Sequence, residues 1–304
     1  CKGLLFFMSN ELKSTFVCDL GDCSSSRPCM GVQKMFGFQC SVKRYHTFFV
    51  SDSFLPDTVS EKEKETRIMI ITLKDGSKKE YAEAKSVIDI AADISEGLAR
   101  VACAGEVDGE VVDLRHVVDK DCELSILTFE DEGGKGAFRH TTSHIMAQAI
   151  KRLYPDVKLA IGPSIADGFY YDIDSENPIT TEDLAKIEVE MKKVVKEALP
   201  ITRFTKSREE AIAFFKEKNE PYKVELIEDL PEDAEISFYQ QGEFVDLCAG
   251  PHLMTTKPVK AFKLTSIAGA YWRGSEKNKM LTRIYGTSFT KKADLEEYIT
   301  RMEE

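Results

Sequence analysis

Two short stretches of this sequence concentrate side chains that can do acid–base or metal chemistry. FVDLCAGPH, at residues 244–252, holds Asp246, Cys248 and His252, and RHTTSH, at residues 139–144, holds His140 and His144. The chain has only five histidines in 304 residues, and three of them fall in these two stretches. Imidazole, thiol and carboxylate groups are those that proteins use to move protons and to bind transition metals.

The spacing of these residues indicates how they are presented. His140 and His144 are four residues apart, which places both rings on one face of a helix. Cys248 and His252 have the same separation, but the Gly-Pro pair between them is incompatible with a regular helix. A tight loop is therefore predicted there, and functional groups are commonly carried on loops.

Two kinds of chemistry fit this group of side chains. Three histidines and one cysteine match the ligands of a tetrahedral zinc site. They equally match a pocket that activates water, with a histidine as the base and Asp246 orienting it. Taken singly, such a histidine pair is more commonly a surface or core feature, and a lone cysteine a small buried hydrophobe. Their combination in one domain favours a functional site.

Length, composition and charge limit the class of protein. The 304 residues suffice for two or three domains. No apolar run approaches the roughly 20 residues of a membrane span, and eight cysteines without paired C-x₂-C spacing predict reduced thiols. We therefore expect a cytoplasmic protein. The net charge of −11 argues against a general nucleic-acid coat. Residues 257–283 are nevertheless basic, which predicts either a local RNA-binding face or a solvated surface.

The chain divides into four regions. Residues 1–66 have weak periodicity and are interpreted as a divergent or non-native N-terminal extension, with a small extra domain as the alternative. Residues 67–129 predict a small β-grasp-like domain, because a hairpin around Asp75-Gly76 and a helix capped by Ser86 precede further short strands. EDEGGKG, at 130–136, is predicted to be a linker.

Residues 137–290 predict a larger α+β domain with an antiparallel sheet. A helix ends before Pro155, an amphipathic helix covers 180–199, and apolar runs at 159–174, 260–274 and 279–289 predict strands. Residues 291–304 predict a helix without a C-cap, interpreted as the start of a linker helix to an absent catalytic domain.

Several of these stretches resemble a known family. RHTTSH, IGPSIADGFYYDID, FVDLCAGPH and AGAYWRGSEKNKMLTRIYGT are similar to the editing (SAD) domain of bacterial threonyl-tRNA synthetases. Residues 67–129 resemble the TGS domain that precedes it in that family. The resemblance covers residues 67–304, and no class II catalytic or anticodon-binding motif is visible after residue 290. We therefore expect this chain not to aminoacylate tRNA. Whether the natural chain continues past Glu304 is left open.

The resemblance implies hydrolysis of mischarged seryl-tRNA(Thr). Serine and threonine differ by one methyl group, which binding alone discriminates by only about 1–3 kcal/mol. A second pocket that accepts serine and excludes threonine solves this problem. The implied partner is the acceptor end of tRNA(Thr) carrying serine, with no membrane involved and dimerisation left open.

The resemblance also implies roles for individual residues. Water would attack the ester carbonyl at the tRNA 3′ end, positioned or deprotonated by His140 and Cys248. Lys223 would stabilise charge near the ribose hydroxyl, and Asp246 would anchor the serine amine or hydroxyl. His144 and His252 would hold the pocket by hydrogen bonds. Substrate-binding candidates are Gly162 and Tyr171 beside the pocket, and Trp272 and Arg273 on an RNA face or, for the tryptophan, in packing.

Zinc and two other functions remain alternatives. Related alanyl-tRNA editing proteins hold a metal with a similar constellation, here His140, His144, Cys248 and His252, but we expect editing to require no cofactor. The chain could instead be a non-catalytic tRNA-binding or regulatory module, or a zinc-dependent hydrolase of another substrate. The intact histidine, cysteine and aspartate set favours editing over the first alternative. The AYWRG context disfavours the second.

Overall fold

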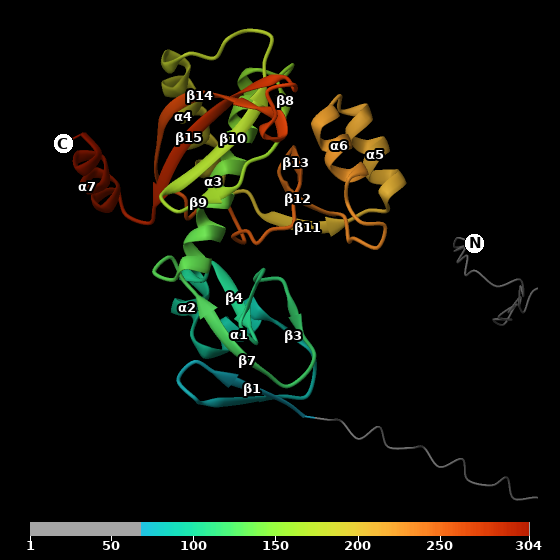
Figure 1. The fold of residues 1–304 in the computed structure, drawn as a ribbon. Coiled ribbons are helices and arrows are strands. Elements are labelled where there is room, and N and C mark those ends of the chain that lie inside the picture. The colour runs from blue at the N-terminus through green and yellow to red at the C-terminus, as the bar shows by residue number, and fades with distance from the viewer. Residues whose placement is uncertain (1–67, 304) are drawn as a thin grey trace, which may run out of the picture. The chain divides into compact units, whose positions relative to one another are not determined.

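The computed structural model describes residues 68–303 (Figure 1), and the interpretation of residues 1–66 therefore lies outside the described residues. The first module is a five-stranded mixed sheet in the order β2-β1-β7-β4-β5, in which β1 runs parallel to β7. Its sheet strands are β1 (Met69–Leu73), β2 (Lys78–Tyr81), β4 (Ala104–Val107), β5 (Glu110–Val112) and β7 (Cys122–Leu127). A small second sheet pairs β3 (Lys85–Ser86) with β6 (Val117–Val118), and the helices are α1 (Val87–Ile94) and α2 (Glu96–Val101).

Apolar burial on one face of this sheet holds the first module together. Ser86 caps α1 by accepting a hydrogen bond from the Asp89 amide, as predicted. The helix then buries Val87 and Ile90 completely, in one apolar cluster with Ile71 and Leu124 of the sheet. A helix packed on a mixed sheet agrees with the predicted β-grasp module.

A single long helix leads from this module into the next one. α3 (Glu132–Leu153) has 22 residues, so the prediction of a linker at 130–136 is wrong from Glu132 on. Two of the three glycines in this segment serve close packing: a Cβ on Gly134 would lie 1.8 Å from the Thr128 carbonyl oxygen, and one on Gly133 would lie 2.8 Å from Leu127. These contacts seat the first turn of α3 directly against the end of β7.

The second module is built on an antiparallel sheet, as predicted. Its order is β14-β15-β10-β8, formed by β14 (Ala261–Tyr271), β15 (Met280–Phe289), β10 (Gly168–Asp174) and β8 (Lys158–Leu159), with β9 (Ser164–Ile165) paired to β10. α3 and α4 (Thr181–Glu197) contribute to its apolar core, and α4 begins at the capping box of Thr180 and Asp183. η1 (Trp272–Gly274) lies between the two long strands, and α7 (Lys292–Glu303) ends the described chain.

A smaller sheet carries the FVDLCAGPH stretch. It contains β11 (Ile201–Thr205), β12 (Ser237–Gln241) and β13 (Phe244–Leu247), all antiparallel. α5 (Arg208–Glu217) and α6 (Pro221–Glu228) pack against it through Phe215, Ile227 and Phe238. The α+β prediction is confirmed for the described residues. None of their helices is long and apolar enough to cross a membrane.

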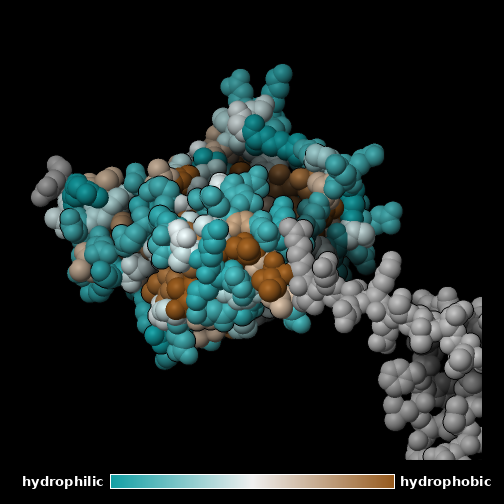
Figure 2. All heavy atoms as spheres, turned by 90° about the horizontal axis from the view of Figure 1, so that it is seen from below, coloured by the Kyte–Doolittle hydropathy of each residue, from teal (hydrophilic) through white to brown (hydrophobic). Residues whose placement is uncertain are grey.

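Figure 2 shows one face of the molecule, where apolar side chains form separate patches interrupted by hydrophilic ones. The first module exposes five large apolar side chains, those of Ile68, Ile70, Val101, Val111 and Val117. Apolar residues scattered on a surface are ordinary for a folded protein, so these carry no argument for a partner.

Replacing Gly134 by alanine tests the seating of α3. The new methyl group would collide with the Thr128 carbonyl, and overpacking of this kind costs about 1–3 kcal/mol in the free energy of unfolding. Gly136→Ala is the matched control, because its Cβ would meet only Ser164 Oγ at 3.7 Å and helix propensity favours alanine by about 1 kcal/mol. Urea unfolding should therefore show opposite signs for the two variants, and equal stabilisation by both would contradict the packing.

Candidate functional site

The structure brings the two predicted clusters together. α3 carries His140 and His144, and the segment after β13 carries Cys248 and His252. The ring of His252 lies 4.2 Å, between centroids, from each of the other two rings. Cys248 Sγ lies 3.4 Å from His140 Nε2 and 3.2 Å from His252 Nε2.

The loop after β13 has its shape because of Gly250. This glycine has φ of +80°, a region that side chains other than glycine disfavour. A Cβ there would lie 2.2 Å from the Tyr239 hydroxyl. The Gly250 amide donates to Cys248 Sγ at 3.2 Å, and the chain reverses so that His252 returns to the same sulfur. The predicted tight loop is therefore present.

Hydrogen bonds fix the tautomer of His252. Thr141 Oγ1 donates to the Ala137 carbonyl and accepts from the Leu253 amide. Its contact with His252 Nδ1, 3.2 Å away, must then be accepted from an Nδ1–H. His252 Nε2 is left as an acceptor, which fits donation from the Cys248 thiol. Sequence reasoning did not single out Thr141, although it lies inside RHTTSH.

Burial keeps these groups neutral. It lowers the pKa of His140 to about 4 and that of His144 to about 3, and it lowers the pKa of His252 well below its ordinary value. Burial also raises the pKa of the Cys248 thiol to about 12. His144 and His252 are 3% and 0% exposed, whereas His140 is only partly buried. His140 is thus the most exposed of the three rings.

A buried ion pair adjoins the histidines. Lys223 Nζ lies 2.5 Å from Asp246 Oδ1, and the Tyr171 hydroxyl donates to Asp246 Oδ2 at 2.5 Å. His144 Nε2 is 3.5 Å from the same oxygen. Burial by itself raises the pKa of Asp246, but Lys223 and the other partners bring it below its ordinary value. Burial and the neighbouring carboxylate raise the pKa of Tyr171, which keeps its hydroxyl as a donor.

One cavity of about 470 Å³ borders these groups, and its lining includes His140, His144, Gly162, Lys223, Asp246 and Cys248. Gly162 has no room for a side chain, because a Cβ would lie 2.1 Å from the Tyr171 ring. Tyr171 is 0% exposed, and its ring packs against Gly162 on the side away from the cavity. The catalytic and pocket candidates of the sequence thus meet in one place, and their roles remain predictions.

Trp272 and Arg273 do not line this cavity. The indole of Trp272 is buried, donates to Glu225 Oε2 at 2.9 Å and packs edge-on against Tyr222. Arg273 Nη1 pairs with Asp229 Oδ2 at 2.6 Å. For the tryptophan, the structure shows packing against α6, and a contact of either residue with RNA remains a prediction.

The basic stretch 257–283 is only partly neutralised. Lys263, Lys279 and Arg283, as well as Arg273, pair with acids of other elements. Lys257 and Lys260 instead line a second hollow of about 370 Å³ together with Lys192 and Lys196 of α4. Within residues 68–303, none of these four lysines forms an ion pair at 4 Å or less. Such a hollow suits phosphate groups.

The four candidate ligands fit a zinc ion in kind and spacing. One ligand atom from each of His140, His144, Cys248 and His252 lies within 4.8 Å of the others. Zinc at this place would act as a Lewis acid or lower the pKa of a bound water. The Nδ1–H of His252, donated to Thr141, is the kind of outer contact that metal-binding histidines make.

Comparison with known proteins agrees with the domain order. Residues 69–128 match the TGS domain, and residues 236–285 match the second additional domain of threonyl and alanyl tRNA synthetases. The chain is 68% identical over 234 residues to a threonine–tRNA ligase of Acetivibrio thermocellus, and 63% identical over 234 residues to one of Clostridioides difficile. It is 60% identical over 240 residues to one of Caldanaerobacter subterraneus. These matches cover 77%, 77% and 79% of this chain but only 37% of each relative.

Acid should destabilise the protein through its buried histidines. Because their folded pKa values are about 4 for His140 and about 3 for His144, the unfolded chain binds more protons than the folded one below pH 6.5. The free energy of unfolding should be unaffected by them above that pH and fall progressively below it, by about 2 kcal/mol per histidine at pH 5. Urea unfolding between pH 7.5 and 5 measures this, and His144→Gln should flatten the profile. A wild-type profile that is already flat would show that the folded rings take up protons at the same pH as the unfolded chain, and would contradict the lowered pKa values.

Proposed function

This chain shares the TGS domain and the second additional domain, in the same order, with the threonine–tRNA ligases, and from this premise we propose that its histidine–cysteine pocket hydrolyses seryl-tRNA(Thr). One observation carries the proposal: a single cavity joins the partly buried imidazole of His140, the Cys248 thiol and the Lys223 ammonium. Aminoacyl ester hydrolysis requires a held water and a group that stabilises the developing oxyanion.

His140 and Cys248 are the groups that hold the water. The ring of His140 reaches the cavity, and its Nε2 lies 3.4 Å from Cys248 Sγ. A thiol with a pKa near 12 is a poor nucleophile at neutral pH. Attack by an oriented water molecule therefore fits the pocket better than a covalent thioester intermediate. With its low pKa, His140 orients that water mainly as a hydrogen-bond partner.

Lys223 supplies the positive charge for the oxyanion and the ribose hydroxyl. The side chains of Asp246 and Tyr171 hold its Nζ at 2.5 and 3.0 Å. Because these three side chains are buried, water screens the charge of Lys223 only weakly. Asp246 also remains our candidate anchor for the serine amine or hydroxyl, while His144 and His252 hold the wall of the pocket.

The acceptor end of tRNA(Thr) is the proposed partner, in the cytoplasm. The hollow of unpaired lysines formed by Lys192, Lys196, Lys257 and Lys260 supports contact with RNA phosphates. The same hollow also favours the alternative of a non-catalytic tRNA-binding module, which would need the lysines but not the cavity. The chain spans about 37% of the relatives it matches, so joining threonine to tRNA is a property of those proteins.

Alanine variants of His140 and Cys248 test the hydrolysis. Each should slow deacylation of seryl-tRNA(Thr) by about 10²–10⁴-fold, because each removes one group that positions the water. The double variant should lose less than the product, since the two side chains act on the same water. Threonyl-tRNA(Thr) should be spared. The assay uses high protein concentration and low salt, to favour RNA binding.

Two controls accompany this assay. Cys122→Ala and His116→Ala remove a thiol and an imidazole of the first module, outside the cavity, and should leave the rate unchanged. Wild-type protein that deacylates seryl-tRNA no faster than buffer, while still binding the tRNA, would establish the binding-module alternative.

Metal analysis separates metal-free editing from zinc chemistry. We expect well under one zinc per chain in protein purified without chelator, and no loss of deacylation after treatment with a chelator. Stoichiometric zinc that disappears in His144→Ala would instead make Cys248 a thiolate ligand and favour a zinc hydrolase.

A further inference from the structure

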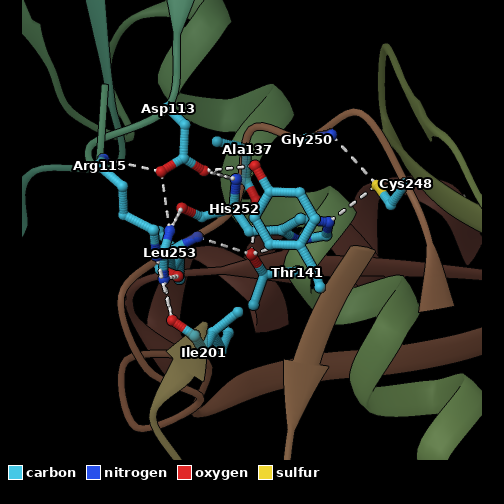
Figure 3. Close-up of polar contacts among 10 residues, drawn as sticks. Asp113, Arg115, Ala137, Thr141, Ile201, Cys248, Gly250, His252 and Leu253 are labelled. Atoms are coloured by element: carbon cyan, nitrogen blue, oxygen red, sulfur yellow. Dashed lines mark hydrogen bonds and ion pairs between the residues drawn. The ribbon is translucent and has the colours of Figure 1, made fainter. Parts of the chain in front are cut away.

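Two charged residues of the first module reach the loop that carries His252 (Figure 3). Asp113 and Arg115 lie between β5 and β6, and their side chains are only 10% and 18% exposed. Asp113 Oδ1 accepts from both the backbone amide and Nη1 of Arg115, at 2.8 Å each. This arrangement fixes the two side chains as one unit and leaves Asp113 Oδ2 for other partners.

This unit holds both sides of the His252 backbone. The His252 amide donates to Asp113 Oδ2 at 3.0 Å. Arg115 donates to the carbonyls of His252 at 3.3 Å and Leu253 at 2.9 Å, and also to the carbonyl of Ile201. These partners lie up to 139 positions apart in the sequence. Buried charged groups with several hydrogen bonds are far more restrictive than an exposed ion pair.

The same unit acts on the ring of His252 through Tyr239. The Tyr239 hydroxyl donates to Asp113 Oδ2 at 2.9 Å, and its ring lies 4.4 Å from that of His252. The far edge of the His252 ring then contacts Cys248 Sγ. A continuous series of contacts therefore runs from the first module to the thiol in the cavity.

We propose that Asp113 and Arg115 are positioning residues for the editing site, holding the His252 loop so that Cys248 keeps its place beside His140. The expected effect on deacylation rests on the proposed function, whereas the expected effect on the position of Cys248 does not. It gives the TGS domain of this chain a part in editing: its β5–β6 loop completes the support of the pocket. Neither residue touches the cavity, so substrate binding should depend on them little.

Deacylation kinetics give the first readout. Asp113→Ala and Arg115→Ala should each lower kcat for seryl-tRNA(Thr) by about 10²-fold, the usual effect of a displacement near 1 Å in a catalytic group. KM should change little, because the cavity wall is retained. Asp119→Ala and Arg100→Ala, at exposed positions of the same module, are the matched controls and should keep the wild-type rate.

Alkylation of Cys248 gives a second readout that needs no activity. Iodoacetamide should modify the wild-type thiol slowly, because Cys248 is partly buried and its sulfur contacts the rings of His140 and His252 and the Gly250 amide. Peptide mapping should show at least about tenfold faster modification of Cys248 in both variants. If wild-type protein fails to hydrolyse seryl-tRNA, the proposed function is wrong. The alkylation rates still test whether Asp113 and Arg115 hold Cys248 in place.

Isosteric and conservative variants exclude simple unfolding. Asp113→Asn keeps the shape but offers one carbonyl oxygen to four donors, so it should still lower kcat and expose Cys248. Arg115→Lys, which retains a cation that can donate to carbonyls, should recover part of the rate lost in Arg115→Ala. Unchanged kcat and unchanged Cys248 alkylation in folded Asp113→Asn would overturn the proposal, as would equal effects in the Asp119→Ala control.

Discussion

The burial of one carboxylate, that of Asp246, is the constraint on which the rest of the site depends. A charged oxygen in the interior is costly unless it is paired and hydrogen-bonded. Its partners come from three different elements: Lys223 from α6, Tyr171 from β10 and His144 from α3. Satisfying this single group therefore fixes how two sheets and two helices meet. The cavity forms where these elements meet, and its shape follows from the requirement that Asp246 stays paired.

The second feature that organises the site is the uncharged state of its three histidines and of Cys248. Three imidazoles and a thiol lie in mutual contact, and their burial favours the uncharged form of each. The adjoining ammonium of Lys223 then supplies the local positive charge. In the proposed hydrolysis, these uncharged side chains and the cation would both face the reacting ester.

The sequence was most informative where chemistry and spacing coincide. The histidine and cysteine clusters could be read because helical spacing and a Gly-Pro loop are local properties, and the strands of the antiparallel sheet followed from apolar runs. The Gly133-Gly134 pair led to the wrong prediction of a linker, because glycine occurs both in flexible segments and where two backbones pack closely. Trp272 could not be placed, because its partner Glu225 lies 47 positions away. The contacts of Asp113 and Arg115 depend on how two modules meet, and no periodicity in the chain encodes that.

α3 runs without interruption from Glu132, close to the end of β7, to the pocket. The distance of a residue along this helix is therefore linked to the direction in which its side chain points. Each residue of a helix advances about 1.5 Å and turns about 100°. Adding or removing one residue between Gly134 and His140 would therefore swing both histidines away from Cys248, even if every side chain were kept. Only changes of about a whole turn preserve the phase. A hybrid protein that joins the first module of one relative to the second module of another must therefore keep the same number of α3 residues between them, as well as a compatible sequence.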